Sequence, residues 1–100
     1  MDLSAPDGVA VARRLIETAD VMVENYRFGV MDRHGLGYDT VSALNPRIIY
    51  CSLTGFGHTG PKARHPAYDV VIQAYSGLMA ANGTPDSSPV RVGQIGRAHV

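Results

Sequence analysis

The sequence has 100 residues, 45% of them hydrophobic and 18% charged, and its nine basic and nine acidic residues cancel. This length suffices for one small domain and is too short for a typical two-domain enzyme. The balanced charge excludes a long-range field that would attract nucleic acid or an anionic membrane, so any anion must be bound by local groups. We therefore expect neither nucleic acid nor a membrane among the partners.

No stretch approaches the roughly 20 apolar residues of a membrane-spanning helix, and the first residues lack the basic and apolar regions of a secretory signal. These features predict a cytoplasmic protein. The single cysteine, Cys51, lies in an apolar run, which excludes an internal disulfide and favours a buried thiol. His58 and His65 have no carboxylate or thiolate cluster at metal spacing, so we expect surface or loop hydrogen-bonding roles and no metal site.

The first predicted element is a helix over residues 5–18. Ser4 and Asp7 have the spacing of a capping box, and Pro6 fits the first helical turn. One face is apolar at helical spacing and is expected to pack on a sheet. It consists of Ala12, Leu15, Ile16 and Ala19.

Two strands follow in the predicted order. The run 21–23 is apolar and β-branched at its ends, which predicts a strand buried on both faces that ends at Glu24. Residues 47–54 predict a second strand. The helices expected over 29–34 and 38–44 form a crossover between them, so the strands should pair in parallel.

The remaining chain predicts a ligand-facing loop over residues 55–65, then a helix over 68–81 that tolerates Gly77. At most a short strand is expected over 90–92. The predicted apolar stripe of that helix comprises Val71, Ala74, Tyr75 and Leu78. The element order predicts an α/β fold, a partial Rossmann-like parallel sheet with crossover helices. Ligands bind beyond the carboxyl ends of such strands, so the two strand ends should form two walls of one site.

Four segments carry a resemblance to a known family: LSAPDG, then ADVMVENYRFGVMDRHGLGYDTVSALNPRIIYCSLTGFGHTGP, then AYDVVIQAYSGLMAANG and PVRVG. Their order and spacing resemble the class III coenzyme A-transferases of the CaiB/BaiF type, which include formyl-CoA and carnitine-CoA transferases. We therefore predict that residues 1–94 are part of the large domain of such an enzyme. Residues 95–100 resemble no family segment and look like a translated sequencing adaptor, which predicts a non-native tail on a truncated fragment.

The resemblance implies an enzyme that transfers coenzyme A from an acyl-CoA to a carboxylic acid, working as an interlocked homodimer. In the family an aspartate attacks the acyl-CoA and then carries coenzyme A as a thioester, which is covalent catalysis. That aspartate lies beyond the position of Gly93, and no Asp or Glu follows Asp86 here. We assign no catalytic residue and expect this chain alone to be inactive.

The resemblance also implies two groups of residues that bind coenzyme A. Asn25, Tyr26 and Arg27 match the loop after the first strand, and Arg33 matches an arginine that contacts phosphate. Amide, phenol and guanidinium groups suit polar, aromatic and phosphate parts of the ligand. The family usually has proline where this chain has Phe28, which predicts a less rigid loop.

The second group is Pro66, Ala67, Tyr68 and Asp69. Asp69 has an alternative role as a charge at a helix N-terminus. The related acyl-CoA racemases carry a histidine base at the position of Tyr68, and a phenol with a pKa of roughly 10 is a poorer base, so a transferase is favoured. A racemase-like fragment and a non-catalytic CoA-binding module remain the alternatives.

Overall fold

The computed structural model describes residues 1–93, which fall into two compact units. The first unit is Met1–Arg64, and the second begins at His65. Each unit is described by itself below. The predicted tail over residues 95–100 lies outside the described residues.

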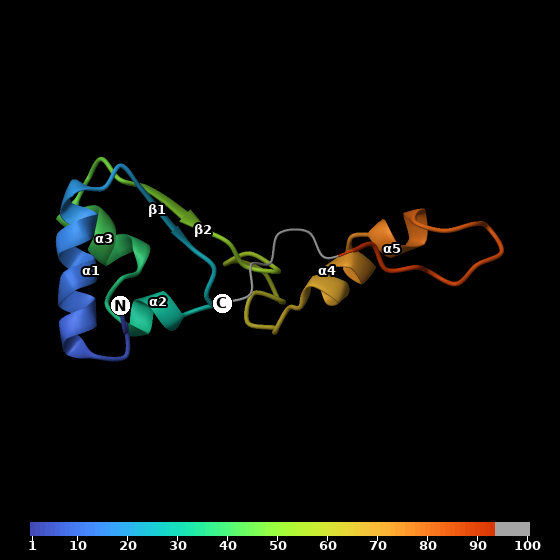
Figure 1. Ribbon diagram of the computed structural model, residues 1–100, viewed down its shortest axis with the longest axis horizontal. Helices are drawn as coiled ribbons and strands as arrows, with labels where there is room; N and C mark the ends of the chain where they lie inside the picture. The colour runs from blue at the N-terminus through green and yellow to red at the C-terminus, as the bar shows by residue number, and fades with distance from the viewer. Residues whose placement is uncertain (94–100) are drawn as a thin grey trace. The chain divides into compact units, whose positions relative to one another are not determined.

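The first unit is an α/β arrangement around a parallel pair of strands (Figure 1). In chain order its elements are α1 (Pro6–Thr18), β1 (Val21–Glu24), α2 (Val30–Arg33), α3 (Tyr38–Leu44) and β2 (Ile49–Ser52). Strands β1 and β2 pair in parallel, with Val21 opposite Ile49 and Glu24 opposite Ser52. Because α2 and α3 connect the strands, the predicted helical crossover and parallel pairing are confirmed.

The core of this unit lies where helices pack on one face of the sheet. It consists of Ala12, Ile16, Met31, Leu36, Val41 and Ile48. On the other face of the sheet, Val21, Val23 and Ile49 are 51%, 62% and 64% exposed. The prediction that the first strand is buried on both faces is therefore wrong, since α1, α2 and α3 cover only one of them.

Helix α1 begins differently from the prediction. Its N-cap is Ala5, which makes no side-chain capping bond, and the Ser4 N–H donates to the Asp2 carboxylate over 2.8 Å. The predicted capping box between Ser4 and Asp7 is therefore wrong. Ala12 and Ile16 are buried as predicted, whereas Leu15 is 59% exposed because it lies beyond the stripe that touches the core.

The C-terminal end of α1 is held by the residue that ends α3. The Nδ2 group of Asn45 donates to the carbonyl oxygens of Ile16 and Ala19, over 2.9 and 2.8 Å. These carbonyls lie at a helix end, where intrahelical partners are missing. One side chain therefore joins two helices that are distant in the sequence.

The second unit holds α4 (Asp69–Tyr75) and α5 (Leu78–Ala81). The predicted continuous helix is wrong, because Gly77 adopts a left-handed backbone with φ 80° between them. The predicted apolar stripe is also wrong at Ala74, Tyr75 and Leu78, which are exposed.

The buried residue of α4 is Gln73, which is 4% exposed. Its side-chain amide pairs with both backbone groups of Val92, accepting from N–H at 2.9 Å and donating to the carbonyl at 3.0 Å. Residues 90–92 form no strand in the part of the chain that the structure describes. The backbone hydrogen bonds of Val92 are therefore made to a side chain rather than to a neighbouring strand.

Two further sequence expectations bear on the fold. Among the described helices, none has the length and apolar character needed to cross a membrane. Cys51 is a free thiol of intermediate exposure, so the prediction of a buried thiol is not met. Its side chain points to the bare face of β2, as the alternation along the strand requires.

Candidate functional site at the carboxyl ends of the strands

Strands β1 and β2 end side by side, at Glu24 and Ser52. The backbone pairing continues one step further, because the Leu53 N–H donates to the Glu24 carbonyl over 2.9 Å. The loops that follow the strands, residues 25–29 and 53–64, therefore leave from the same edge of the sheet (Figure 1). Both strand ends therefore lie at one edge of the sheet, and that they form two walls of one ligand site stays a prediction.

Glu24 organises this edge through a buried carboxylate that is 8% exposed. One of its oxygens accepts the Tyr26 N–H over 2.8 Å, and the other accepts the Ser52 hydroxyl. A buried carboxylate is stable only when such partners replace water. Glu24 thereby fixes the first residues of the loop after β1 and ties them to the end of β2.

The Ser52 hydroxyl also contacts a histidine from the loop that follows β2. His58 Nε2 lies 2.6 Å from Ser52 Oγ, so the expected loop hydrogen-bonding role of His58 is confirmed. The His58 ring packs at 39° to the Phe28 ring, with 5.8 Å between centroids. Glu24, Ser52 and His58 therefore form a hydrogen-bonded relay from the buried sheet edge to the exposed loop.

Phe28 lies between two groups of the second loop. Besides His58, the Arg64 guanidinium carbon lies 5.0 Å from the centroid of the Phe28 ring, which is cation–π geometry. Lys62 Nζ lies 6.0 Å from the centroid of Phe56 in the same loop. Phe28 thus joins the two loops by ring contacts.

Four of the predicted coenzyme A ligands lie in one nine-residue segment of the first unit, residues 25–33. Asn25, Tyr26 and Arg27 directly follow β1 and are exposed, and Arg33 is the exposed last residue of α2. A turn joins the two groups, since the Val30 N–H donates to the Arg27 carbonyl over 3.1 Å and Gly29 has φ 79°. Amide, phenol and guanidinium groups of Asn25, Tyr26 and Arg27 therefore follow the end of β1, and the guanidinium of Arg33 lies one short helix further along the chain.

The other predicted ligands belong to the second unit. Tyr68 is the N-cap of α4, and Asp69 occupies its first turn. The Asp69 carboxylate accepts the Gln73 Nε2–H over 2.6 Å. Asp69 therefore has the alternative role expected from the sequence, as an acidic group at a helix N-terminus.

A cavity of about 320 Å³ lies among α1, β1 and α2 in the first unit. Its lining is mainly apolar and includes Leu15, Met22 and Met31. Among the predicted ligands only Tyr26 lines it, beside Glu24. Among residues 1–93, no basic side chain lines the cavity, so this lining suits an apolar group and not phosphate.

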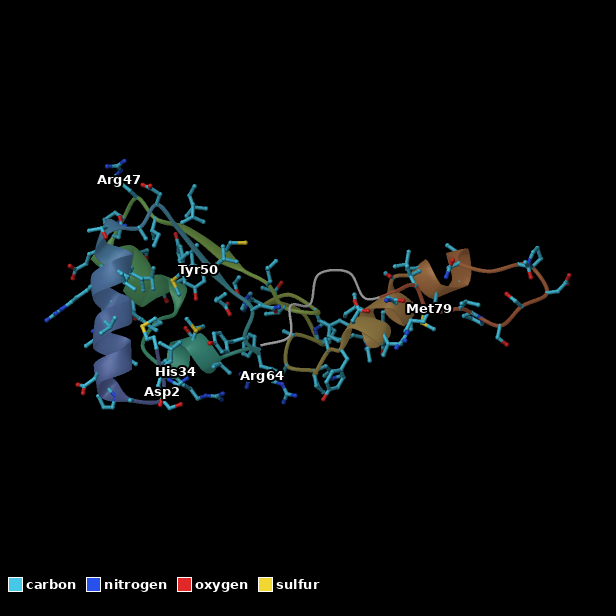
Figure 2. All side chains as sticks on the ribbon, viewed as in Figure 1. Asp2, His34, Arg47, Tyr50, Arg64 and Met79 are labelled. Carbon is cyan, nitrogen blue, oxygen red and sulfur yellow. The ribbon has the colours of Figure 1, made fainter. Side chains whose placement is uncertain are left out.

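Tyr50 is a titratable group on β2, two residues before the end of the strand. Burial raises the pKa of its phenol above the ordinary value, and the negative charges of Glu24 and Asp32 raise it further. The hydroxyl donates to the Leu36 carbonyl over 3.1 Å, and the ring meets Tyr38 edge-on at 5.9 Å. Tyr50 lies between the sheet and the helices, where it holds its proton more firmly than a solvated phenol (Figure 2).

Within residues 1–93 no group of three or more His, Cys, Asp or Glu side chains has the arrangement of a metal site. Sequence reasoning missed Glu24 and Ser52 as site residues. The predicted parallel pairing could have indicated them, because parallel strands that end together bring their last side chains into contact on one face of the sheet.

Comparisons with known proteins identify the family. The model of "CoA-transferase family III" matches residues 1–96. The succinate–glutarate CoA-transferase of Agrobacterium fabrum is 47% identical over 92 residues, which are 92% of this chain and 23% of that protein. The acetyl-CoA:oxalate CoA-transferase of Acetobacter aceti is 52% identical over 84 residues, which are 84% of this chain and 22% of that protein.

Solved structures agree with this relationship and with the predicted Rossmann-like α/β fold. A CaiB/BaiF family protein from Brucella suis superposes with a TM-score of 0.87 at 45% identity, covering 93% of this chain and 25% of that one. A protein from Mycobacterium tuberculosis superposes with a TM-score of 0.81 at 35% identity, covering 94% of this chain and 27% of that one. The chain thus spans about a quarter of the length of the proteins that it matches. It belongs to CoA-transferase family III.

Proposed function

We propose that this chain forms part of the coenzyme A site of an enzyme that moves coenzyme A between carboxylic acids. One observation carries the proposal: within the family match, exposed Asn25, Tyr26 and Arg27 follow β1 on a backbone that the buried Glu24 carboxylate holds. A fixed backbone with exposed polar side chains suits ligand binding, because little freedom is lost when the ligand arrives.

Each side chain has a part of the ligand to which its chemistry is suited. The guanidinium groups of Arg27 and Arg33 would bind phosphate oxygens by charge-assisted hydrogen bonds. The Tyr26 ring offers an apolar face to adenine or to the pantetheine arm, and the Asn25 amide can both donate and accept. In the second unit, Pro66, Ala67, Tyr68 and Asp69 are proposed as further contacts.

The transfer itself would use an aspartate carboxylate that attacks the acyl-CoA and then carries coenzyme A as a thioester. Residues 87–100 contain no Asp or Glu, so the chain supplies binding groups and not this nucleophile. We therefore expect no transfer by the chain alone. In the proposed enzyme, residues 1–94 belong to the large domain of an interlocked cytoplasmic homodimer.

The acids of the proposed reaction are small dicarboxylates. Support comes from the names of two relatives that are 47% and 52% identical to this chain, which act on succinate and glutarate and on oxalate. In an assay of the whole enzyme, transfer to dicarboxylates should exceed transfer to monocarboxylates of equal length. Faster transfer to the monocarboxylates would contradict this substrate class.

Calorimetric titration of coenzyme A into the chain tests the binding role. We expect saturable binding that Arg33→Ala weakens by about tenfold or more, since a hydrogen bond to a charged group contributes about 1.5–3 kcal/mol. The matched control is Arg47→Ala, which removes an exposed arginine just before β2, at the opposite end of the strand (Figure 2). Equal affinities of the two variants, or no binding by the unaltered chain, would contradict the proposal.

A non-catalytic CoA-binding module would give the same titration result, so a second assay is needed to distinguish it from a transferase. The whole enzyme should transfer coenzyme A from an acyl-CoA to an added acid, which a module would not do. Tyr68 disfavours a racemase, because a phenol is a poor base near neutral pH. Exchange of the α-hydrogen of a branched acyl-CoA without transfer would instead support the racemase.

A further inference from the structure

The relay of Glu24, Ser52 and His58 has a defined hydrogen-bond direction. Glu24 accepts on both carboxylate oxygens, from the Tyr26 N–H and from the Ser52 hydroxyl, as an ionised carboxylate does. A serine hydroxyl has one hydrogen, and here it points to Glu24. Ser52 Oγ can therefore only accept from its other neighbour.

That other neighbour is His58 Nε2, 2.6 Å away. Since Ser52 Oγ accepts in this contact, His58 must carry a hydrogen on Nε2. In the neutral imidazole the second ring nitrogen then has a free electron pair and acts as an acceptor. The contact with Ser52 engages Nε2, and the His58 side chain is exposed.

We infer that His58 presents Nδ1 as a hydrogen-bond acceptor to the pantetheine end of coenzyme A, with Glu24 and Ser52 as positioning residues that set its tautomer. The inference rests on the proposed function, because it assigns one contact within that site. The pantetheine arm offers amide N–H groups and the terminal thiol, which are donors. The loop that carries His58 leaves the same sheet edge as the loop of Asn25 and Tyr26, and the Phe28 ring holds the imidazole in place.

The arrangement also separates two tasks at this edge of the sheet. Arg27 and Arg33 can act only as donors, so they suit the phosphates. His58 Nδ1 is an acceptor and suits the uncharged arm. An imidazole with a fixed tautomer loses less freedom on binding than one that must first exchange its proton.

The tautomer can be measured directly by long-range ¹H–¹⁵N NMR spectra of the full chain at pH about 8, above the ordinary histidine pKa. We expect His58 to show a protonated Nε2 and an unprotonated Nδ1. Ser52→Ala should convert it to a mixture of tautomers, whereas Ser52→Thr, which keeps the hydroxyl, should restore the single form. His34 takes no part in the relay and should give the same spectrum in all three proteins.

Addition of coenzyme A to the same samples tests the contact. We expect the His58 Nδ1 resonance to shift on binding, with an affinity about fivefold lower in Ser52→Ala and unchanged in Ser52→Thr. Acetyl-CoA, which has no thiol hydrogen, identifies the donor. A shift with both compounds supports an amide donor, and a shift with coenzyme A alone supports the thiol.

The outcomes that would overturn the inference are distinct from failure of the proposed function. A His58 ring protonated on Nδ1, or on both nitrogens, would overturn the relay. Binding of coenzyme A without a shift at Nδ1 would overturn the ligand contact and leave the proposed function intact. No binding of coenzyme A to any of the proteins would overturn both.

Discussion

Glu24 and Ser52 stand opposite each other at the carboxyl ends of β1 and β2, and the serine hydroxyl donates to the buried carboxylate. Their contact depends on the register of the parallel pair, which places the last side chain of each strand on the helix-covered face. The same carboxylate holds the Tyr26 N–H. The sheet pairing thereby fixes the backbone from which the proposed ligand-binding side chains extend.

The Glu24 carboxylate is expected to stabilise the first unit. Glu24→Ala should lower the free energy of unfolding by about 1–3 kcal/mol, because it leaves the Tyr26 N–H and the Ser52 hydroxyl without their acceptor. Urea unfolding followed by circular dichroism measures the change. Glu17→Ala removes an exposed glutamate from α1 and should change stability by less than about 0.5 kcal/mol. Equal effects of the two substitutions would contradict the role of Glu24.

Stability at alkaline pH should report on Tyr50. Its pKa is raised in the folded state, so the folded state holds this proton more tightly than the unfolded chain. The resulting stabilisation is complete below the unfolded tyrosine pKa of about 10 and is lost as pH rises through the higher folded pKa. The stability advantage of the unaltered protein over Tyr50→Phe should therefore shrink as pH rises above about 10.

The Tyr50 hydroxyl should also stabilise the protein at neutral pH. At neutral pH, Tyr50→Phe should cost about 1 kcal/mol, since the hydrogen bond to the Leu36 carbonyl is lost. The control is Tyr38→Phe, which changes a 60% exposed tyrosine and leaves Tyr50 in place. This variant should lose stability above about pH 10 as the unaltered protein does. An unchanged difference between the unaltered protein and Tyr50→Phe across the alkaline range would refute the prediction.

Gly77 should be intolerant of a side chain for conformational reasons. A Cβ atom there would meet nothing within 4 Å, but the residue has φ 80°, which costs an L-residue roughly 1–2 kcal/mol. Gly77→Ala should destabilise the second unit by about this amount in thermal unfolding. Gly93→Ala is the control, because that site has equal space and no positive φ. Similar melting temperatures for both variants would count against the strain.

The fold could be predicted from the sequence where local pattern and tertiary packing agree. The two strands, the crossover helices and the parallel pairing follow from apolar runs interrupted by turn residues. The prediction of one helix over residues 68–81 is wrong because helical periodicity carries no information about the sign of φ at a glycine. Gly77 could continue a helix or take the left-handed conformation, and the structure has the second. Likewise the buried Gln73 has a polar partner, Val92, that no periodicity indicates.

The bare face of the sheet should make the chain self-associate. Val23, Ile49 and Leu53 are exposed there, and parallel sheets normally bury both faces. Sedimentation velocity should show oligomers that the double substitution Val23→Thr and Ile49→Thr reduces, since threonine keeps the β-branched shape. Val11→Thr changes a 48% exposed valine on α1 and should leave association unaltered. A monodisperse monomer of the unaltered chain with a cooperative thermal transition would refute this expectation.

The candidate site was predictable in its location but not in its internal contacts. Two strands that end at one edge follow from the crossover, so the place of Asn25, Tyr26 and Arg27 could be foreseen. The relay could not, because it needs the pairing of Glu24 with Ser52 and the path of a loop that brings His58 back to the strand end. Loop paths depend on contacts such as the one between Phe28 and His58, which a linear pattern does not encode.

We propose that the carboxyl ends of β1 and β2 bind coenzyme A. Backbone amide chemical shifts of the ¹⁵N-labelled chain, mapped during titration with coenzyme A, locate the binding site. We expect saturable shifts concentrated in residues 25–33 and 53–64, with little change in α1 or at Arg47. Shifts centred on α1 or on the amino ends of the strands, or no shifts at any concentration of coenzyme A, would contradict it.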